Sequence, residues 1–289
     1  MILSEEIKRK IRYIQICTRS MISGNLIGDF SSAIKGTGHE FDQIRDYQQG
    51  DDVRFVDWKS SARANKFLVK QYLEERNRTI IIMVDISGSA FFSSDVQSKY
   101  ETMAQIASVL TLVADYGKDN VGLVLFSDKV DEFISPARGK MHGMNIMKKL
   151  FEIKPTEKLT NLNVALEYVA KNVKRDSIVF LLSDFIDSSS YEKNLRVLTK
   201  KCELISIRCT DKNEEEFPEV GFINVRDFET GEMLLLNVNK NKNNINEELK
   251  AVISEQNKMF KKYKIDVLNL NKKDFIVELV CFFKRIMAY

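Results

Sequence analysis

Apolar runs typical of strands alternate with helical patterns along most of this chain. Ile80 to Val84 is a continuous, mostly β-branched apolar run of the kind found in strands that are buried on both faces. Similar runs predict strands at residues 121–126, 130–134, 178–182, 204–207 and 267–270. Apolar positions spaced by three and four predict helices at residues 100–116, 144–151, 162–173, 191–198, 243–262 and 275–286. This alternation predicts an α/β fold with a mostly parallel sheet covered by helices on both faces.

Two segments near the C-terminus do not follow this alternation. Residues 222–225 and 233–238 flank Glu229-Thr230-Gly231, which predicts a hairpin appended to the main sheet. The Lys/Asn-rich tract at residues 237–246 is predicted to be an exposed loop.

The first 78 residues have a different pattern. Ile7, Ile11, Ile14, Cys17 and Met21 predict an amphipathic helix. Residues 24–52 contain five glycines and no sustained period, which predicts a long structured loop. Short strands are expected around residues 54–75, with Trp58 as a core anchor. We therefore predict a small N-terminal α+β subdomain at residues 1–78 and an α/β domain at residues 79–289.

Composition and charge restrict the classes of protein to which this chain can belong. With 44% hydrophobic residues and a net charge of +3, the chain is predicted to be folded rather than disordered. Residues 1–80 hold 14 Lys and Arg against 11 Asp and Glu, so the whole surplus lies there. Both signs are interleaved in this segment, whereas nucleic-acid binding needs a clustered basic patch. No nucleic-acid partner is expected.

The cysteines and the hydropathy pattern indicate a cytoplasmic protein. The four cysteines are far apart and form no C-x-x-C pair, which argues against a zinc knuckle or a disulfide framework. Charged residues interrupt the N-terminus, so it does not have the pattern of a signal peptide. No run approaches the roughly 20 apolar residues of a transmembrane segment.

The candidate site follows the first buried strand. Asp85, Ser87 and Ser89 offer one carboxylate and two hydroxyls at alternate positions, which suits a hard cation such as Mg²⁺. Thr160 precedes a predicted helix and Asp184 follows another buried strand, so both are expected at the same edge of the sheet. The alternative is that these polar residues only cap the following helices.

Several kinds of catalytic site do not fit the sequence. Ser87 stands where a haloacid dehalogenase-type phosphatase needs a second Asp, two residues after the first. His39 and His142 are the two histidines, and neither lies near a nucleophile elbow. Gln43 stands where a zinc metalloprotease helix needs its second His. The chain has no P-loop, so any ATP hydrolysis must come from a partner.

The motifs together resemble a known family. Asp85, Ser87, Ser89, Thr160 and Asp184 match, in order, the five positions of the metal-ion-dependent adhesion site of von Willebrand factor type A domains. The block ahead of them resembles the core motif of domain-of-unknown-function family 58, whose members carry it before a von Willebrand type A-like domain. The residues that carry this second resemblance are Gly36, Gly38, Phe41, Arg45, Tyr47, Gly50, Asp51, Arg54, Asp57, Trp58 and Arg63.

This resemblance implies a function. It implies a bacterial, Mg²⁺- or Mn²⁺-dependent protein-binding adaptor, not itself an enzyme, that acts with a MoxR-type AAA+ ATPase in a chaperone-like or maturation role. A metal-dependent hydrolase that uses the same carboxylates is the alternative. The block from Gly36 to Arg63 is either an interface for a partner or a structural attachment to the sheet. Many family members begin with membrane-spanning helices, and this sequence shows none.

Overall fold

The structure is a computed structural model of the 289-residue chain. It describes residues 11, 14, 40–48, 53, 56–73, 78–91, 97–154, 159–187, 189–211, 222–226, 233–271 and 275–287. The chain divides into two compact units, one formed by residues 34–78 and the other by residues 1–33 and 79–289.

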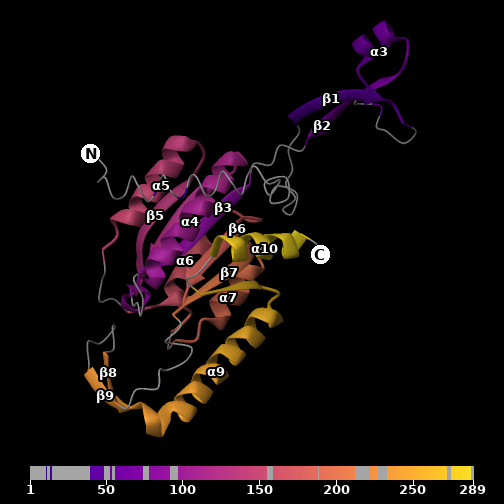
Figure 1. Cartoon of the computed structure of the whole chain (residues 1–289). Helices are drawn as coiled ribbons and strands as arrows, with labels where there is room; N and C mark the ends of the chain where they lie inside the picture. Colours follow the sequence, from indigo (N-terminus) through magenta and orange to yellow (C-terminus); the bar gives the residue numbers. More distant parts are fainter. Residues whose placement is uncertain are drawn as a thin grey trace. The chain divides into compact units, whose positions relative to one another are not determined.

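A six-stranded sheet forms the centre of the larger unit (Figure 1). The strand order is β10-β7-β6-β3-β4-β5, and neighbouring strands run parallel except for β5, which is antiparallel to β4. The strands are β3 (Thr79–Asp85), β4 (Asn120–Phe126), β5 (Val130–Ala137), β6 (Ile178–Ser183), β7 (Glu203–Thr210) and β10 (Asp266–Asn271). This arrangement confirms the predicted α/β class with a mostly parallel sheet.

Helices cover both faces of this sheet (Figure 1). On one face, Ile81 and Met83 of β3 pack in a buried cluster with side chains of α6, α7 and α9. On the other face α4 packs against α5, and Phe283 of α10 contacts Phe180 of β6. The helices are α4 (Lys99–Tyr116), α5 (Lys140–Glu152), α6 (Leu162–Asn172), α7 (Glu192–Thr199), α9 (Val238–Lys262) and α10 (Phe275–Met287).

Local sequence signals explain the positions of two elements. Ser98 caps α4, because its side chain accepts from the backbone N–H of Glu101, whose carboxylate accepts from the N–H of Ser98. Gly122 lets β4 and β5 approach closely, since a Cβ there would lie 2.9 Å from the carbonyl oxygen of Ile134.

Of two expectations near the C-terminus, the first is confirmed in part and the second is wrong. The predicted hairpin forms from β8 (Phe222–Arg226) and β9 (Met233–Asn237), but among the described residues it is a separate two-stranded sheet and does not extend the main sheet. The Lys/Asn-rich tract is helical, because α9 begins at Val238, directly after β9. Lys and Asn tolerate a helix when an amphipathic stripe continues through it, so low complexity is a weak sign of a loop here.

The smaller unit contains an antiparallel pair of strands and a short helix between them in the sequence. Its elements are β1 (Glu40–Asp46), antiparallel to β2 (Leu68–Leu73), and α3 (Trp58–Ala64). Part of the predicted loop is therefore a strand, and part of the segment predicted as strands is a helix. Trp58 is 60% exposed, so its prediction as a core anchor is wrong. It packs edge-on against Phe67, which is itself exposed.

The N-terminal segment belongs to a different unit from the motif block. We predicted residues 1–78 as one unit, whereas the structure groups residues 1–33 with the α/β body. The described residues Ile11 and Ile14 are helical and buried, which is consistent with a helix that packs on that body. No helix in the described part of the chain is long and apolar enough to cross a bilayer.

Candidate functional site

The site lies at the carboxyl ends of the parallel strands, where loops from three strands meet. The backbone N–H of Ile86, after β3, donates to the carbonyl of Phe126 at the end of β4 (2.8 Å). The N–H of Asn161 donates to the carbonyl of Ser127 (2.9 Å), and the N–H of Leu162 donates to the carboxylate of Asp187 after β6 (2.7 Å). These bonds tie the loops that carry the predicted site residues to one edge of the sheet.

Asp85 is a fully buried carboxylate at this edge, with none of its surface exposed. Its Oδ1 accepts from the backbone N–H of Ser87 (2.9 Å), and its Oδ2 accepts from the hydroxyl of Ser183 (2.7 Å). Burial and the negative charge of Asp184 raise the pKa of Asp85 to about 7, although its hydrogen bonds oppose this. The groups that donate to Asp85 are neutral, so its charge is not neutralised by them.

Ser87 and Ser89 lie beside Asp85. Ser87 is fully buried, and its Oγ lies 3.2 Å from the Oγ of Ser89. The short 3₁₀ helix η3 (Gly88–Phe91) begins between them and brings the two hydroxyls together. The structure therefore joins three of the predicted ligands in one cluster.

Asp184 lies close enough to Asp85 for its negative charge to raise the pKa of Asp85. Asp184 is itself paired with the side chain of Lys99, which the sequence did not predict. Its Oδ2 is 2.7 Å from the Nζ of Lys99, and the side chains of Lys99 and Asp184 are 0% and 1% exposed. Its Oδ1 accepts from the backbone N–H of Ile186 (3.1 Å). Lysine is rarely buried without a partner. Only the burial of the start of α4 could have indicated this pair.

Thr160 is partly buried and precedes Asn161, whose N–H is bonded to the end of β4. The side chain of Asn161, not that of Thr160, caps α6 by accepting from the N–H of Val164. Since Ser98 caps α4, helix capping does not account for the site residues that precede these two helices.

The residues of the first loop fit a hard divalent cation. One carboxylate and two hydroxyls lie together, and the buried carboxylate forms no ion pair with any residue that the structure describes. Within the described ranges no three His, Cys, Asp or Glu side chains form a cluster that could hold an ion, so any ion would depend on hydroxyl ligands. An ion that binds Asp184 would have to compete with the Lys99 ammonium for the carboxylate oxygen.

The predicted interface block is only partly described. Phe41 and Arg45 lie on β1, Tyr47 follows it, and Trp58 and Arg63 lie on α3. Asp57 caps α3 by accepting from the N–H groups of Lys59 and Ser60. Gly36, Gly38, Gly50, Asp51 and Arg54 lie outside the described residues. The exposed rings of Tyr47 and Trp58 both pack edge-on against Phe67.

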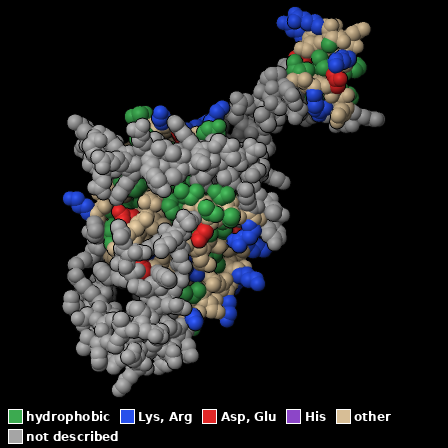
Figure 2. Space-filling view, viewed as in Figure 1, with side chains coloured by type: hydrophobic (Ala, Val, Ile, Leu, Met, Phe, Trp, Pro, Cys, Tyr) green, Lys and Arg blue, Asp and Glu red, His purple; other side chains and the backbone are tan. Residues whose placement is uncertain are grey.

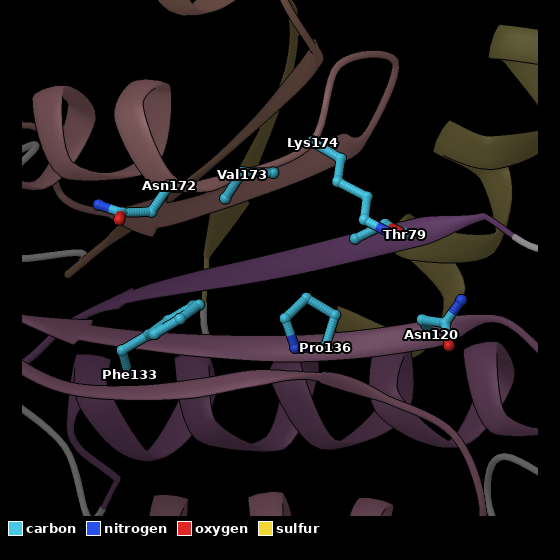
Figure 3. A pocket seen from close by; sticks show the side chains of 7 residues that line it. All are labelled: Thr79, Asn120, Phe133, Pro136, Asn172, Val173 and Lys174. Atoms are coloured by element: carbon cyan, nitrogen blue, oxygen red, sulfur yellow. The ribbon is translucent and has the colours of Figure 1, made fainter.

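A cavity of about 190 Å³ lies at the opposite edge of the sheet (Figure 3). Thr79 and Asn120 begin β3 and β4, and the other lining residues come from β5 and the end of α6: Phe133, Pro136, Asn172, Val173 and Lys174. The described lining residues include no carboxylate, histidine or thiol. His142 also lies toward this edge, where its Nε2 is 2.7 Å from the carbonyl oxygen of Val121. Neither feature adds to the candidate site.

The distribution of Lys and Arg over one face of the molecule bears on nucleic-acid binding. Figure 2 shows Lys and Arg side chains distributed over the face in view rather than gathered in one patch. This pattern does not resemble a nucleic-acid footprint on that face.

Comparison with known proteins identifies a family whose model matches most of this chain. The model of the family described as "Protein of unknown function DUF58" matches residues 43–259. An uncharacterized protein of Mycobacterium bovis is 25% identical over 223 residues, which cover 76% of this chain and 70% of that protein. The uncharacterized protein YeaD of Bacillus subtilis is 30% identical over 108 residues, which cover 37% of this chain and 25% of that protein.

Solved structures show weaker similarity. The conserved hypothetical protein BatB from Bacteroides thetaiotaomicron aligns with a TM-score of 0.49 and 14% identity, over 73% of this chain and 100% of that one. The SpRpn10 VWA domain aligns with a TM-score of 0.40 and 9% identity, over 71% of this chain and 93% of that one.

Proposed function

The chain belongs to the family of unknown function DUF58 and has a von Willebrand factor type A-like fold, and on this premise we propose that it is a Mg²⁺- or Mn²⁺-dependent protein-binding adaptor. In this proposal Asp85, Ser87 and Ser89 hold the ion, and Thr160 and Asp184 complete its surroundings. The adaptor acts with a MoxR-type AAA+ ATPase in a chaperone-like or maturation role.

The observation that carries the proposal is the state of Asp85. A fully buried carboxylate that accepts neutral hydrogen bonds from the described residues and faces a second carboxylate is costly unless a cation offsets its charge. Two hydroxyls at alternate positions beside it supply further hard oxygen ligands.

The surroundings of the site support protein binding. A bound divalent cation supplies positive charge that an acidic side chain of a partner can engage. Leu159, directly before Thr160, is 49% exposed, and Ile186, two residues after Asp184, is 52% exposed. Apolar side chains beside a charged centre are typical of an interface core with a polar anchor. The choice of a MoxR-type ATPase rests on the family resemblance.

The ion is tested by thermal unfolding of the full chain in Mg²⁺, Mn²⁺ or chelator. An ion present at about 100 times its Kd stabilises the folded state by about 2.7 kcal/mol. For a domain of this size that is a rise in Tm of roughly 5–10 °C. Asp85→Ala should abolish the rise, whereas Asp266→Asn, a change of an exposed carboxylate on β10, should keep it. Equal responses of wild type and Asp85→Ala would show that the metal site is wrong.

The partner is tested by co-purification with a MoxR-type ATPase from the same genome. We expect a complex that dissociates in chelator and is not formed by Asp85→Ala. A complex that persists in chelator would show that the metal is not part of the interface. A screen of phosphoester and peptide substrates tests the hydrolase alternative. Turnover by wild type that is lost in Asp85→Ala would support catalysis and contradict the docking proposal.

A further inference from the structure

Lys99 occupies an unusual place for a lysine. It is the first residue of α4, yet its side chain is fully buried and its Nζ lies 2.7 Å from Asp184 Oδ2. A cation at a helix N-terminus is opposed by the helix dipole, and burial of an ammonium costs several kcal/mol before pairing. Both local preferences therefore oppose a lysine here.

Stability does not explain the pair. A buried ion pair generally contributes no more than well-packed apolar residues of the same volume. The sheet around it is built from such residues, since Ile82, Val84 and Ile207 are all fully or almost fully buried. The location of the pair is more informative, because Asp184 is one of the two carboxylates of the candidate site and acts electrostatically on the other, Asp85.

The charges of the cluster can be counted from the described residues. Asp85 and Asp184 as ionised carboxylates and the Lys99 ammonium sum to −1, and a divalent cation would change this sum to +1. Without Lys99 the carboxylates alone would carry −2, and the same ion would only neutralise them. Lys99 therefore lowers the attraction for a cation and makes the occupied site more positive by one unit charge, which favours an acidic partner.

We propose that the Lys99 ammonium is a built-in counter-ion of Asp184 that competes with the divalent cation for this carboxylate. Lys99 thereby sets the affinity of the site for the ion and the positive charge that the occupied site offers to a partner. This inference rests on the metal site proposed above and assigns Lys99 a role in regulating it.

The test measures Mn²⁺ binding to the full chain at about pH 8 by the electron paramagnetic resonance signal of free Mn²⁺. Removal of one unit charge a few ångströms from the ion should make Lys99→Met bind Mn²⁺ at least about tenfold more tightly than wild type. Lys171→Met is the matched control, because Lys171 forms an exposed ion pair with Glu167 on α6. It should bind Mn²⁺ as wild type does.

A double variant tests whether the effect acts through Asp184. Lys99→Met with Asp184→Asn removes both charges of the pair and also a carboxylate of the site, so the gain in affinity seen in Lys99→Met should be lost. An equal gain in the double variant would show that Lys99 does not act through Asp184. If Lys99→Met does not fold, as judged by circular dichroism, Lys99→Gln keeps a donor for Asp184 without the charge and takes its place.

The outcomes separate this inference from the proposed function. Mn²⁺ binding by wild type that Lys99→Met does not strengthen would overturn the role of Lys99 and leave the metal site intact. Binding by Lys99→Met alone would support Lys99 as the resident cation and overturn the metal dependence of the natural protein. Absence of binding in both would overturn both proposals.

Discussion

The cost of burying Asp85 predicts an unusual dependence of stability on pH. The pKa of Asp85 is raised from its ordinary value of 3.8 to about 7 in the folded protein. The folded state therefore holds this proton more tightly than the unfolded state. The resulting stability is greatest below about pH 4 and falls as pH rises toward 7. Each pKa unit is worth roughly 1.4 kcal/mol, so ionised Asp85 costs about 4 kcal/mol above pH 7 in the absence of metal.

Asp85→Asn removes this cost and keeps most of the geometry. The amide oxygen can still accept from the N–H of Ser87, and the amide nitrogen faces Ser183, whose hydroxyl must then accept instead of donate. The altered hydrogen bond costs about 1 kcal/mol. In chelator at about pH 8 we expect Asp85→Asn to exceed wild type in free energy of unfolding by about 3 kcal/mol. At pH 5 this difference in free energy of unfolding should largely disappear.

Urea unfolding followed by circular dichroism measures this difference, with chelator present at pH 5 and pH 8. The difference between variant and wild type should change by about 3 kcal/mol between these conditions. Saturating Mg²⁺ should reverse the order, because only wild type keeps the carboxylate. A difference that is the same at both pH values would refute the reasoning about Asp85.

Two further substitutions test the framework that holds the site. Gly122→Ala should destabilise the chain by about 1–3 kcal/mol in urea unfolding, because the new methyl group would meet the carbonyl oxygen of Ile134 on the neighbouring strand. An unchanged midpoint would contradict that close approach. Arg208→Lys should cost about 2–3 kcal/mol, since a lysine cannot reproduce the separate hydrogen bonds to Gln256 and Asn257. Equal stability of this variant would show that those bonds contribute little.

The α/β body could be predicted because its signal is local. Each buried strand is a short apolar run such as Ile80 to Val84, and each helix carries its own period, so type and order follow from neighbouring residues. The smaller unit lacks such signals. Trp58 would be expected inside a core, but two paired strands and one short helix are too small to enclose an indole, and it remains 60% exposed.

In the candidate site, too, only the part with a local sequence signal could be predicted. Asp85, Ser87 and Ser89 lie within five residues and follow a recognisable strand, so their grouping could be read from the sequence. Lys99 could not be found in this way, because its partner Asp184 lies 85 positions away. Its position at the start of a helix resembles that of an ordinary surface lysine. Only the parallel pairing of β3 with β6 brings the two loops together.

Distant contacts also fix the position of Asp184. Phe185, the next residue, has a φ of 60°, a left-handed conformation that costs a non-glycine residue about 1–2 kcal/mol. It is held there because its buried ring packs edge-on against Phe260 of α9, while Gln256 donates to its carbonyl oxygen. The Arg208 guanidinium lies over both rings and bonds Gln256. Helix α9 therefore holds the loop that presents Asp184 to Lys99, and the charge balance of the site depends on the position of this helix.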